Sequence, residues 1–332
     1  MEYCETGQWT CKPIHHNLEF ANSLIELEAI MSFERRDFIK TTSLSAVGLY
    51  LARWAEGTTS AQEAASLALV KNGSPAQMAR KSVELLGGMT RFVKNGQTVV
   101  IKPNMSWDRP PEMAVNTNPE LVAEIVKMCG EAGASRVKVF DRTIENPNNC
   151  YLRSGIAKAA SAAGADVHFV DDRQFVPVKI ENGYTLKEWA FYREALEADV
   201  LINVPILKRH VITSVTMGFK NMMGLVGGAR SRFHGSFDQM IVDIHRVLRP
   251  KLTILDAYCA LLQNGPGGGS MAGVYKMKTV VAGTDPVMVD VAGAKLLGAS
   301  VKSLPYLSLA EKAGLGTTTY PQGLPLQYSF HS

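Results

Sequence analysis

The stretch from Asp199 to Gly228 combines residue types that bind anions or move protons. It begins with an apolar run, Val200 to Val204, whose length and β-branched content predict a buried strand. Pro205 ends the pattern because proline has no N–H to donate to a sheet. Lys208 and His210 come directly after it. A lysine can hold a carboxylate or phosphate, and a histidine can bind a metal or move protons near neutral pH.

The second half of this stretch has apolar residues at helical spacing and therefore predicts a helix. Its apolar face consists of Ile212, Val215, Phe219, Met222 and Met223. A hydroxyl-and-lysine stripe, Thr213, Thr216 and Lys220, falls on another face. Gly224, Gly227 and Gly228 close the segment.

The elements that would position these residues alternate between strand and helix. Strands are predicted at 98–101, 136–140, 166–170, 200–204, 252–255 and 279–282, with helices between most of them. This alternation predicts an α/β fold with a mainly parallel sheet, or sheets, covered by helices. Two α/β lobes with a cleft between them are an alternative arrangement of the same elements.

Polar residues recur where the predicted strands end, and ligands of such folds gather beyond the carboxyl ends of strands. We predict a shared cleft whose catalytic groups are Lys208, His210, Lys220 and Asp256. The predicted substrate- or cofactor-binding residues are Lys102, Asn104, Asp141, Asn221, Gly265, Gly267, Gly268, Asp285 and Asp290. The predicted metal ligands are His210 and His234. Each position also has a structural alternative: Asp285 fits a helix N-cap, and Asp290 a surface acid.

The segment from Asn264 to Gly269 is rich in glycine, and its backbone N–H groups could form an anion-binding nest. It matches neither G-x-G-x-x-G nor the Walker A pattern, so it does not indicate a nucleotide. The chain also has no G-x-S-x-G and no H-E-x-x-H motif, which disfavours serine hydrolases and zinc proteases.

The net charge of the 332-residue chain is +4. Basic residues are concentrated between positions 208 and 249, where only Asp238 and Asp243 oppose Lys208, Arg209, Lys220, Arg230, Arg232, Arg246 and Arg249. This clustering favours a small anionic ligand. It does not indicate nucleic acid, because the segment lacks interleaved aromatic residues and any known binding motif.

The front of the chain predicts export. Glu34-Arg35-Arg36-Asp37-Phe38-Ile39-Lys40 resembles a twin-arginine signal, and an apolar stretch with a small-residue cleavage site comes after it. We therefore predict a signal peptide at 31–61, recognition by the twin-arginine export machinery, and a periplasmic or exported location. Met31 precedes the signal, so residues 1–30 are predicted to be a non-native upstream extension, and 62–97 a helical lead-in.

Cysteine content and hydropathy limit the remaining classes. The three cysteines after residue 61 are Cys129, Cys150 and Cys259, and no C-x-x-C pair occurs, so this chain supplies no iron–sulfur ligand set of its own. A metal ion is still a possible cofactor. No run of about 18 apolar residues is present, so we expect no stable membrane span.

Several of these motifs together resemble the family called domain of unknown function 362. The motifs are Val100-Ile101-Lys102-Pro103-Asn104, Asn203-Val204-Pro205-x-x-Lys208-x-His210, Thr216-x-Gly218-x-Lys220-Asn221-x-x-Gly224, Ile254-x-Asp256, Asn264-Gly265-Pro266-x-Gly268 and Asp285-Pro286-x-x-x-Asp290. The resemblance implies a family domain over 98–316 and a C-terminal tail over 317–332, and it implies no particular reaction. Many members look like ferredoxin-linked proteins because of a cysteine-rich domain that this chain lacks. The stretch 208–234 is also distantly similar to the nickel-pincer lactate racemase group, which places lysine and histidine around a cofactor.

These features support three functional hypotheses. The first is an exported enzyme that binds a small anionic substrate, or a metal or organic cofactor, in a cleft lined by lysine, histidine and aspartate. The second is a non-catalytic periplasmic binding or assembly protein. The third is a redox subunit that docks an iron–sulfur protein supplied by another chain.

Overall fold

The computed structural model describes residues 12–13, 66–268 and 270–331. The chain divides into two units, residues 1–12 with 65–332 and residues 13–64, and the first unit contains the central sheet. The twin-arginine segment and its predicted cleavage site lie outside the described residues.

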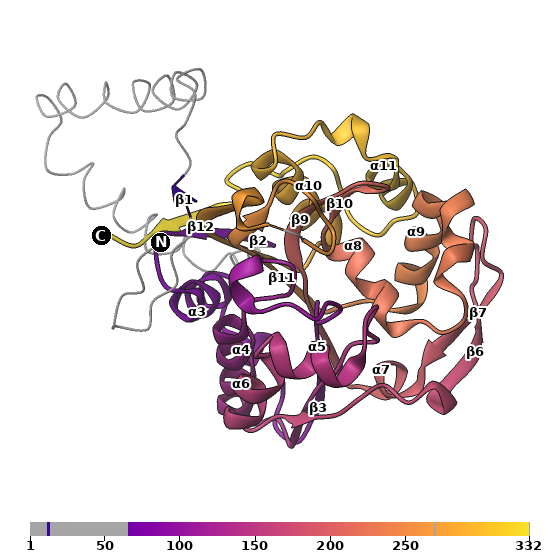
Figure 1. Cartoon of the computed structure of the whole chain (residues 1–332), viewed down its shortest axis with the longest axis horizontal. Coiled ribbons are helices and arrows are strands. Elements are labelled where there is room, and N and C mark those ends of the chain that lie inside the picture. The colour runs from indigo at the N-terminus through magenta and orange to yellow at the C-terminus, as the bar shows by residue number, and fades with distance from the viewer. Residues whose placement is uncertain (1–11, 14–65, 269, 332) are drawn as a thin grey trace, which may run out of the picture. The chain divides into compact units, whose positions relative to one another are not determined.

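One large sheet forms the centre of this unit (Figure 1). Its main strands run in the spatial order β13-β2-β12-β11-β8-β3-β4-β5. Their bounds are β2 Leu67–Lys71, β3 Thr98–Pro103, β4 Arg136–Val139, β5 Asp166–Val167, β8 Val200–Val204, β11 Leu252–Leu261, β12 Val274–Gly283 and β13 Leu326–Ser329. β1 (Lys12–Pro13), β9 (Ile206–His210) and β10 (Ser214–Thr216) join the sheet off this path, and β6 (Phe175–Lys179) and β7 (Glu188–Tyr192) form a separate hairpin.

The sheet is mixed and largely parallel. Strands β11, β8, β3, β4 and β5 are parallel to their neighbours in this order, so their carboxyl ends meet at one edge. Strand β12 is antiparallel to both β11 and β2. The predicted α/β class is confirmed. The two-lobed alternative is not what the described residues form, because hydrogen bonding continues without a break from β2 to β5.

Helices cover both faces of the sheet (Figure 1). Helices α3 (Pro75–Leu85), α4 (Pro119–Glu131) and α6 (Ile156–Ala162) pack on one face, against alternate strand residues such as Val99 and Ile101. Helices α9 (Phe237–Val247), α10 (Pro286–Leu296) and α11 (Pro305–Lys312) lie on the other, where Val100 and Leu201 point. This alternation follows from the two-residue period of a strand.

Shorter helical segments connect these layers. They are α5 (Pro147–Arg153), α7 (Arg193–Glu197), α8 (Gly218–Asn221) and the 3-10 turns η2 (Met89–Arg91), η3 (Pro111–Met113), η4 (Asp172–Gln174), η5 (Met222–Leu225), η6 (Arg230–Gly235), η7 (Met271–Gly273) and η8 (Val301–Ser303). Within the described ranges, no helix combines the length and apolar content needed to cross a membrane.

Three segments differ from their sequence-based predictions. Residues 67–71, predicted as part of a helical lead-in, form β2, and the predicted tail contributes β13, which pairs in parallel with β2. Residues 212–223, predicted as one helix, form the turn of the β9–β10 hairpin, β10 itself, the short helix α8 and the start of η5. The apolar spacing matched a helix because short apolar runs do not distinguish a helix from a strand.

Candidate functional site

A buried lysine–aspartate pair stands at the carboxyl edge of the sheet. Lys102 is at the end of β3 and Asp141 follows β4; both are about 1% exposed, and Lys102 Nζ lies 3.0 Å from Asp141 Oδ1. The other carboxylate oxygen accepts hydrogen bonds from Met105 N (2.8 Å) and Ser106 Oγ (3.0 Å). Asp141 therefore compensates the Lys102 charge and fixes the loop after β3.

Asn221 at the end of α8 connects this pair to the neighbouring strands. Its Oδ1 accepts from Lys102 Nζ (2.8 Å) and Asn104 Nδ2 (3.2 Å). Its Nδ2 donates to Lys102 O (3.1 Å) and Asn203 Oδ1 (2.8 Å). All four partners are backbone or side-chain groups of β3, β8 or the residues just beyond β3. All donor and acceptor positions of the amide are thus occupied within the protein, so Asn221 positions Lys102 and Asn104 and does not bind a ligand.

Gly224 allows α8 and η5 to approach the pair closely. A Cβ atom built at Gly224 would overlap Asp141 Oδ1 and would lie 2.6 Å from Lys102 Cε. A larger residue would therefore separate the two charged groups.

Lys208 on β9 is a second buried lysine, only 1% exposed. Its Nζ donates to Asn104 Oδ1 (3.1 Å) and to Val115 O, and it lies 5.8 Å from the centre of the Trp107 ring. These partners carry no negative charge. Burial lowers the pKa of Lys208 well below its usual value, and the neighbouring Lys220 ammonium lowers it further.

His210 at the end of β9 is oriented by the turn that follows it. Its Nδ1 accepts from the backbone N–H groups of Ile212 (3.1 Å) and Thr213 (3.2 Å). An imidazole nitrogen that accepts carries no proton, so the neutral ring holds its proton on Nε2. The hairpin thus directs an N–H donor, rather than a base, away from the turn.

Asp290 on α10 holds the first residues of helix α8 by hydrogen bonds. The Asp290 carboxylate accepts from Gly218 N (2.7 Å), Phe219 N (3.1 Å) and Tyr306 Oη (3.0 Å). Because Asp290 is fully buried, burial raises its pKa to about 6 despite these hydrogen bonds. Asp290 therefore positions α8 and does not line the chamber described below, which corrects its predicted binding role.

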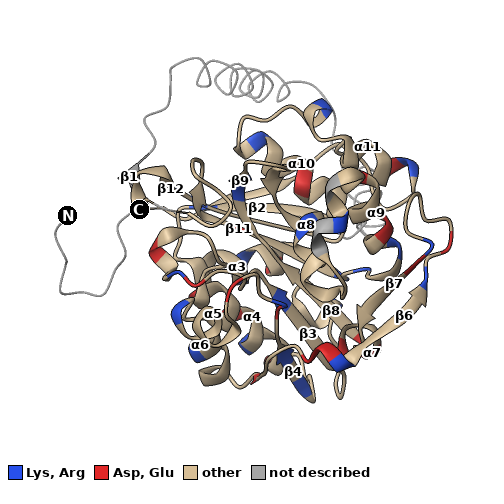
Figure 2. Cartoon of the chain, turned by 45° about the vertical axis from the view of Figure 1, so that its right-hand side comes forward, with Lys and Arg blue, Asp and Glu red and all other residues tan. Residues whose placement is uncertain are grey.

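Lys220 on α8 is the third lysine of the site and differs from the other two. It is partly buried, and no hydrogen bond or ion pair joins its Nζ to another residue in the described part of the chain. Its nearest ring is that of Phe237, 5.9 Å from Nζ. Burial lowers the pKa of Lys220 to about 7. Figure 2 shows the basic segment of α8 in front of the central strands.

These groups line a small chamber of about 100 Å³. Three lysines contribute to its wall, and no aspartate or glutamate does so among the residues that the structure describes. The buried Thr216 Oγ1, which has no hydrogen-bond partner there, also lines it. The lining residues are Lys102, Asn104, Ser106, Trp107, Ile144, Lys208, His210, Thr216, Lys220, Asn221, Met223, Gly224 and Pro266.

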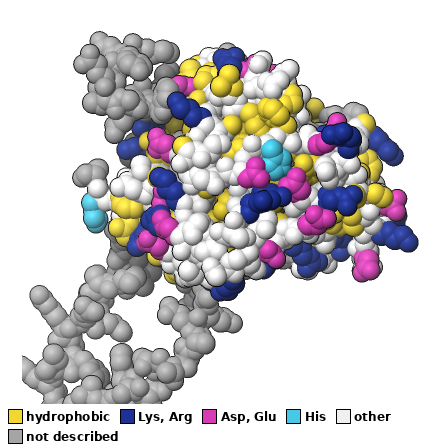
Figure 3. All heavy atoms as spheres, turned by 90° about the horizontal axis from the view of Figure 1, so that it is seen from below, with side chains coloured by type: hydrophobic (Ala, Val, Ile, Leu, Met, Phe, Trp, Pro, Cys, Tyr) yellow, Lys and Arg dark blue, Asp and Glu magenta, His cyan; other side chains and the backbone are white. Residues whose placement is uncertain are grey.

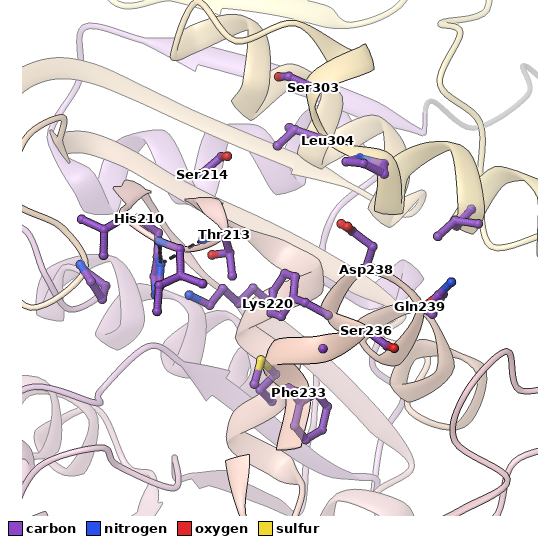
Figure 4. A pocket seen from close by; sticks show the side chains of 18 of the residues that line it. His210, Thr213, Ser214, Lys220, Phe233, Ser236, Asp238, Gln239, Ser303 and Leu304 are labelled. Atoms are coloured by element: carbon purple, nitrogen blue, oxygen red, sulfur yellow. Dashed lines mark hydrogen bonds between the residues drawn. The ribbon is translucent and has the colours of Figure 1, made fainter. Parts of the chain in front are cut away.

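The chamber adjoins an outer cavity of about 810 Å³ (Figure 4). The two spaces share six lining residues: Trp107, Ile144, His210, Lys220, Met223 and Pro266. Most of the remaining wall is apolar or carries hydroxyl groups, as at Phe233, Phe237, Leu304 and Ser236. The outer cavity has the size of a typical small-molecule site.

The charge distribution of the chamber contrasts with that of the surface. On the face seen in Figure 3, basic side chains lie beside acidic ones. Ion pairs of the described residues, such as Lys138–Glu194 and Arg80–Glu131, likewise join a basic side chain to an acidic one. The chamber instead gathers three lysines, two of them almost completely buried, without a described acidic residue in its wall. Such a site attracts an anion more strongly than an exposed cluster of the same charge.

Other predicted site residues lie elsewhere. Asp256 is inside β11, which continues to Leu261 instead of ending at Leu255 as predicted. Its carboxylate accepts from Asn118 N (2.8 Å) and Tyr258 N (2.9 Å), and it lines a separate pocket of about 30 Å³. Burial raises the pKa of Asp256 to about 6. The predicted grouping of Asp256 with Lys208 and Lys220 is not what the structure has.

Asp285 and the glycine-rich loop have structural roles. Asp285 caps α10 by accepting from Val287 N and Met288 N, and its other oxygen accepts from Thr317 N. Gly265 passes against the backbone of Arg209, and Gly267 against the ring of Trp107, so neither position has room for a side chain. Gly268 has a φ of +70°, a conformation that favours glycine. Of the described residues of this loop, only Pro266 lines the chamber.

The predicted metal site is not formed by the described side chains. No group of three or more histidine, cysteine, aspartate or glutamate residues there could hold a metal ion. The side chain of His234 lies outside the described part of the chain. A metal-binding role for His210 and His234 and a redox partner both stay predictions.

Sequence-based prediction missed several chamber residues. Trp107, Ser106 and Ile144 lie in loops beyond β3 and β4, where no motif pointed to them. Their position directly after Lys102–Asn104 and Asp141 was the available signal. Asn203 was part of a recognised motif but was not predicted as a site residue, although its side chain donates to Gly218 O (2.9 Å) and so ties β8 to α8.

The chain belongs to the family described as "Domain of unknown function (DUF362)", whose profile matches residues 99–295. The family predicted from the motifs is therefore confirmed. A curated relative, thylakoid-associated protein sll1697 of Synechocystis sp. (strain ATCC 27184 / PCC 6803 / Kazusa), is 29% identical over 265 residues, which are 77% of this chain and 80% of the relative.

Two solved structures resemble the fold at low identity. The lactate racemase apoprotein of Thermoanaerobacterium thermosaccharolyticum matches 69% of this chain with 11% identity and a TM-score of 0.43. A protein of Thermotoga maritima matches 72% of this chain with 8% identity and a TM-score of 0.41. The match spans 56% and 59% of those chains, less than two thirds of either.

Proposed function

We propose that this protein is an enzyme or binding protein for an organic anion, whose charged group enters the chamber and whose apolar body fills the outer cavity. The observation that carries the proposal is the set of three lysines, Lys102, Lys208 and Lys220, around a space with a single buried carboxylate, Asp141, beside it. A chamber of about 100 Å³ suits a carboxylate or a phosphate group. The outer cavity of about 810 Å³ has room for an organic body attached to the charged group, so we expect an organic ligand.

The two spaces make separable contributions to affinity. The charged head would gain hydrogen bonds from Lys208 and Thr216, each bond to a charged group contributing about 1.5–3 kcal/mol. The apolar body would gain about 0.8 kcal/mol for each methylene that is fully buried. A charged head alone or an apolar tail alone should therefore bind weakly, and a molecule with both should bind well.

Isothermal titration calorimetry with acetate, inorganic phosphate, octanoate and 1-octanol tests this proposal. We expect octanoate to bind at least tenfold more tightly than acetate, and 1-octanol to show no binding. Lys208→Met should weaken octanoate binding about 10–100-fold, as loss of a charge-assisted hydrogen bond predicts. Lys158→Met, which removes an exposed lysine on α6, is the matched control and should bind normally. Equal binding of 1-octanol and octanoate would refute the proposal.

We further propose that the protein is exported by the twin-arginine machinery, on the sequence of residues 34–40 alone. Fusing residues 31–61 to a reporter tests it. Replacing Arg35 and Arg36 by lysine should leave the reporter in the cytoplasm, and unchanged export would argue against this route.

A further inference from the structure

Lys220 is placed at the boundary between the chamber and the outer cavity. It lines both spaces, and in Figure 4 its side chain extends toward His210. The two other lysines are committed: Lys102 Nζ contacts Asp141 and Asn221, and Lys208 Nζ donates to Asn104 and Val115. Lys220 Nζ has no such contact to a described residue. Hydrogen bonds therefore hold two of the three lysines in place, and none to a described residue holds Lys220.

The surroundings of Lys220 favour the neutral amine. The Phe237 ring and Met223 flank it, and burial brings its pKa to about 7. Lys208 is close enough for the Lys220 ammonium to lower the pKa of Lys208. A lysine that is desolvated and next to another cation is the arrangement that activates an amine as a nucleophile.

The boundary position also fixes which ligand atom Lys220 would meet. An anionic group in the chamber places the next carbon of the ligand at the opening, where Lys220 and His210 contribute to the wall. We propose that Lys220 Nζ forms an imine with a carbonyl carbon beside the anionic group, so that the ligand is a 2-oxo acid or a related oxo anion. This inference rests on the proposed function, because it needs the anion to lie in the chamber.

The reaction balances with groups that are present. The Nζ lone pair forms a bond to the carbonyl carbon, and the π electrons of the C=O bond move to oxygen. The two amine hydrogens leave with that oxygen as water, and the imine nitrogen takes a proton from solvent. His210 Nε2–H, left with its proton by the two hydrogen bonds to Nδ1, is placed to donate to the carbonyl oxygen while it gains charge. Lys102 and Lys208 retain the carboxylate.

The charged and titratable groups on the elements around α8 are Lys208, Arg209 and His210 on β9, Asp238, Asp243, His245 and Arg246 on α9, and Asp290 and Lys295 on α10. Burial lowers the pKa of His245 to about 3 and raises the pKa of Asp238. His245 is thus neutral across the neutral range, and Lys220 is the group whose change of state near pH 7 should control imine formation.

Borohydride trapping tests the inference on the full chain. Incubation with 2-oxooctanoate and sodium borohydride should add one ligand per chain, with a mass gain equal to the acid less one oxygen atom, located at Lys220 by peptide mapping. The yield should be half-maximal near pH 7. Lys220→Arg, which keeps the charge, should abolish the adduct, and Lys158→Met should not change it. Excess octanoate should compete.

The outcomes separate this inference from the proposed function. If octanoate binds but no adduct forms at Lys220, imine formation is overturned and anion binding stands. If neither octanoate nor 2-oxooctanoate binds, both are overturned. An adduct spread over exposed lysines at the same rate as at Lys220 would also overturn the inference, because the site would then confer no reactivity.

Discussion

Replacing Lys220 by methionine should stabilise the protein, and the gain should depend on pH. Lys220 is partly buried without a carboxylate partner among the described residues, and burial lowers its pKa from 10.5 to about 7. Methionine has a similar length and suits the wall formed by Phe237 and Met223. The substitution therefore removes a poorly solvated charge without creating a large void.

The size of the effect follows from the two pKa values. Moving a lysine pKa from 10.5 to about 7 corresponds to about 5 kcal/mol of unfavourable interaction with the charged form. Lys220 is only partly buried, so solvent screening reduces this, and we expect about 2–3 kcal/mol. Relief of repulsion on Lys208 has the same sign and adds to the gain.

The direction of the pH dependence is fixed by proton binding. Between pH 7 and 10.5 the unfolded chain keeps a proton on Lys220 that the folded protein has lost, so wild-type stability rises with pH across this window. Below pH 7 both states are protonated and the full cost of burial applies. The advantage of Lys220→Met should therefore be greatest at pH 6 and should diminish toward pH 10.

Urea unfolding at pH 6, 7.5 and 9 measures this difference. Because wild type and variant share all other titrating groups, subtracting their unfolding free energies isolates Lys220 and its coupling to Lys208. Lys158→Met makes the same chemical change at an exposed site and should stay within about 0.5 kcal/mol of wild type at every pH. A constant difference between Lys220→Met and wild type from pH 6 to 9 would refute the reasoning, because it would mean that Lys220 keeps its ordinary pKa.

Two further substitutions test the geometry of the chamber. Gly224→Ala should cost about 3 kcal/mol or more of unfolding free energy and abolish octanoate binding, because the new methyl group would overlap Asp141 Oδ1 and displace Lys102. Gly130→Ala in α4, where no atom lies within 4 Å of the added Cβ, should leave the stability unchanged or raise it. Equal urea unfolding midpoints for Gly130→Ala and Gly224→Ala would contradict this expectation. Thr216→Val removes a buried hydroxyl without a hydrogen-bond partner. The free energy of unfolding should therefore stay unchanged or rise by about 1 kcal/mol, while octanoate binding weakens. A loss of stability would show that the hydroxyl does form a hydrogen bond in the protein.

The strand ends of the fold were predictable because their signals are local. Apolar β-branched runs followed by Lys102-Pro103-Asn104 and by Pro205 marked the ends of β3 and β8, and the parallel sheet brings those ends together. Asp256 shows where such local signals fail. The length of β11 depends on pairing with β12 and β9, which a single sequence does not reveal, so an interior strand residue was taken for a strand end.

The helix predicted over 212–223 failed for a different reason. Val215, Phe219 and Met222 are all buried, so their spacing was a true signal of burial. Two other residues show the error: Ile212 is 64% exposed, and its neighbour Val211 is 79% exposed, at the tip of a hairpin. Pairing of Ser214 with His210 and of Thr216 with Lys208 stabilises the hairpin instead. These contacts decide between helix and hairpin, and propensity alone cannot weigh them.

The three lysines also pose an energetic problem that a ligand would resolve. Lys102 is offset by Asp141, but Lys208 relies on the uncharged oxygens of Asn104 and Val115, and Lys220 contacts no acceptor in the described part of the chain. A chain selected for stability alone would gain by placing apolar side chains at such positions. Repulsion between Lys208 and Lys220 lowers the stability of the ligand-free protein, and both lysines would attract a bound anion. The same charges therefore explain the instability of the free protein and its affinity for an anion.

A bound anion also sets a condition on imine formation. Its charge near Lys220 would raise the pKa of that lysine and so reduce the fraction of nucleophilic amine. Lys102 and Lys208, deeper in the chamber, can take up the negative charge of the carboxylate, so that Lys220 remains under the influence of burial. It is therefore consistent that Lys102 and Lys208 bind the carboxylate while Lys220 forms the imine. If Lys220 were the only lysine in the chamber, binding the anion would raise its pKa and reduce its reactivity.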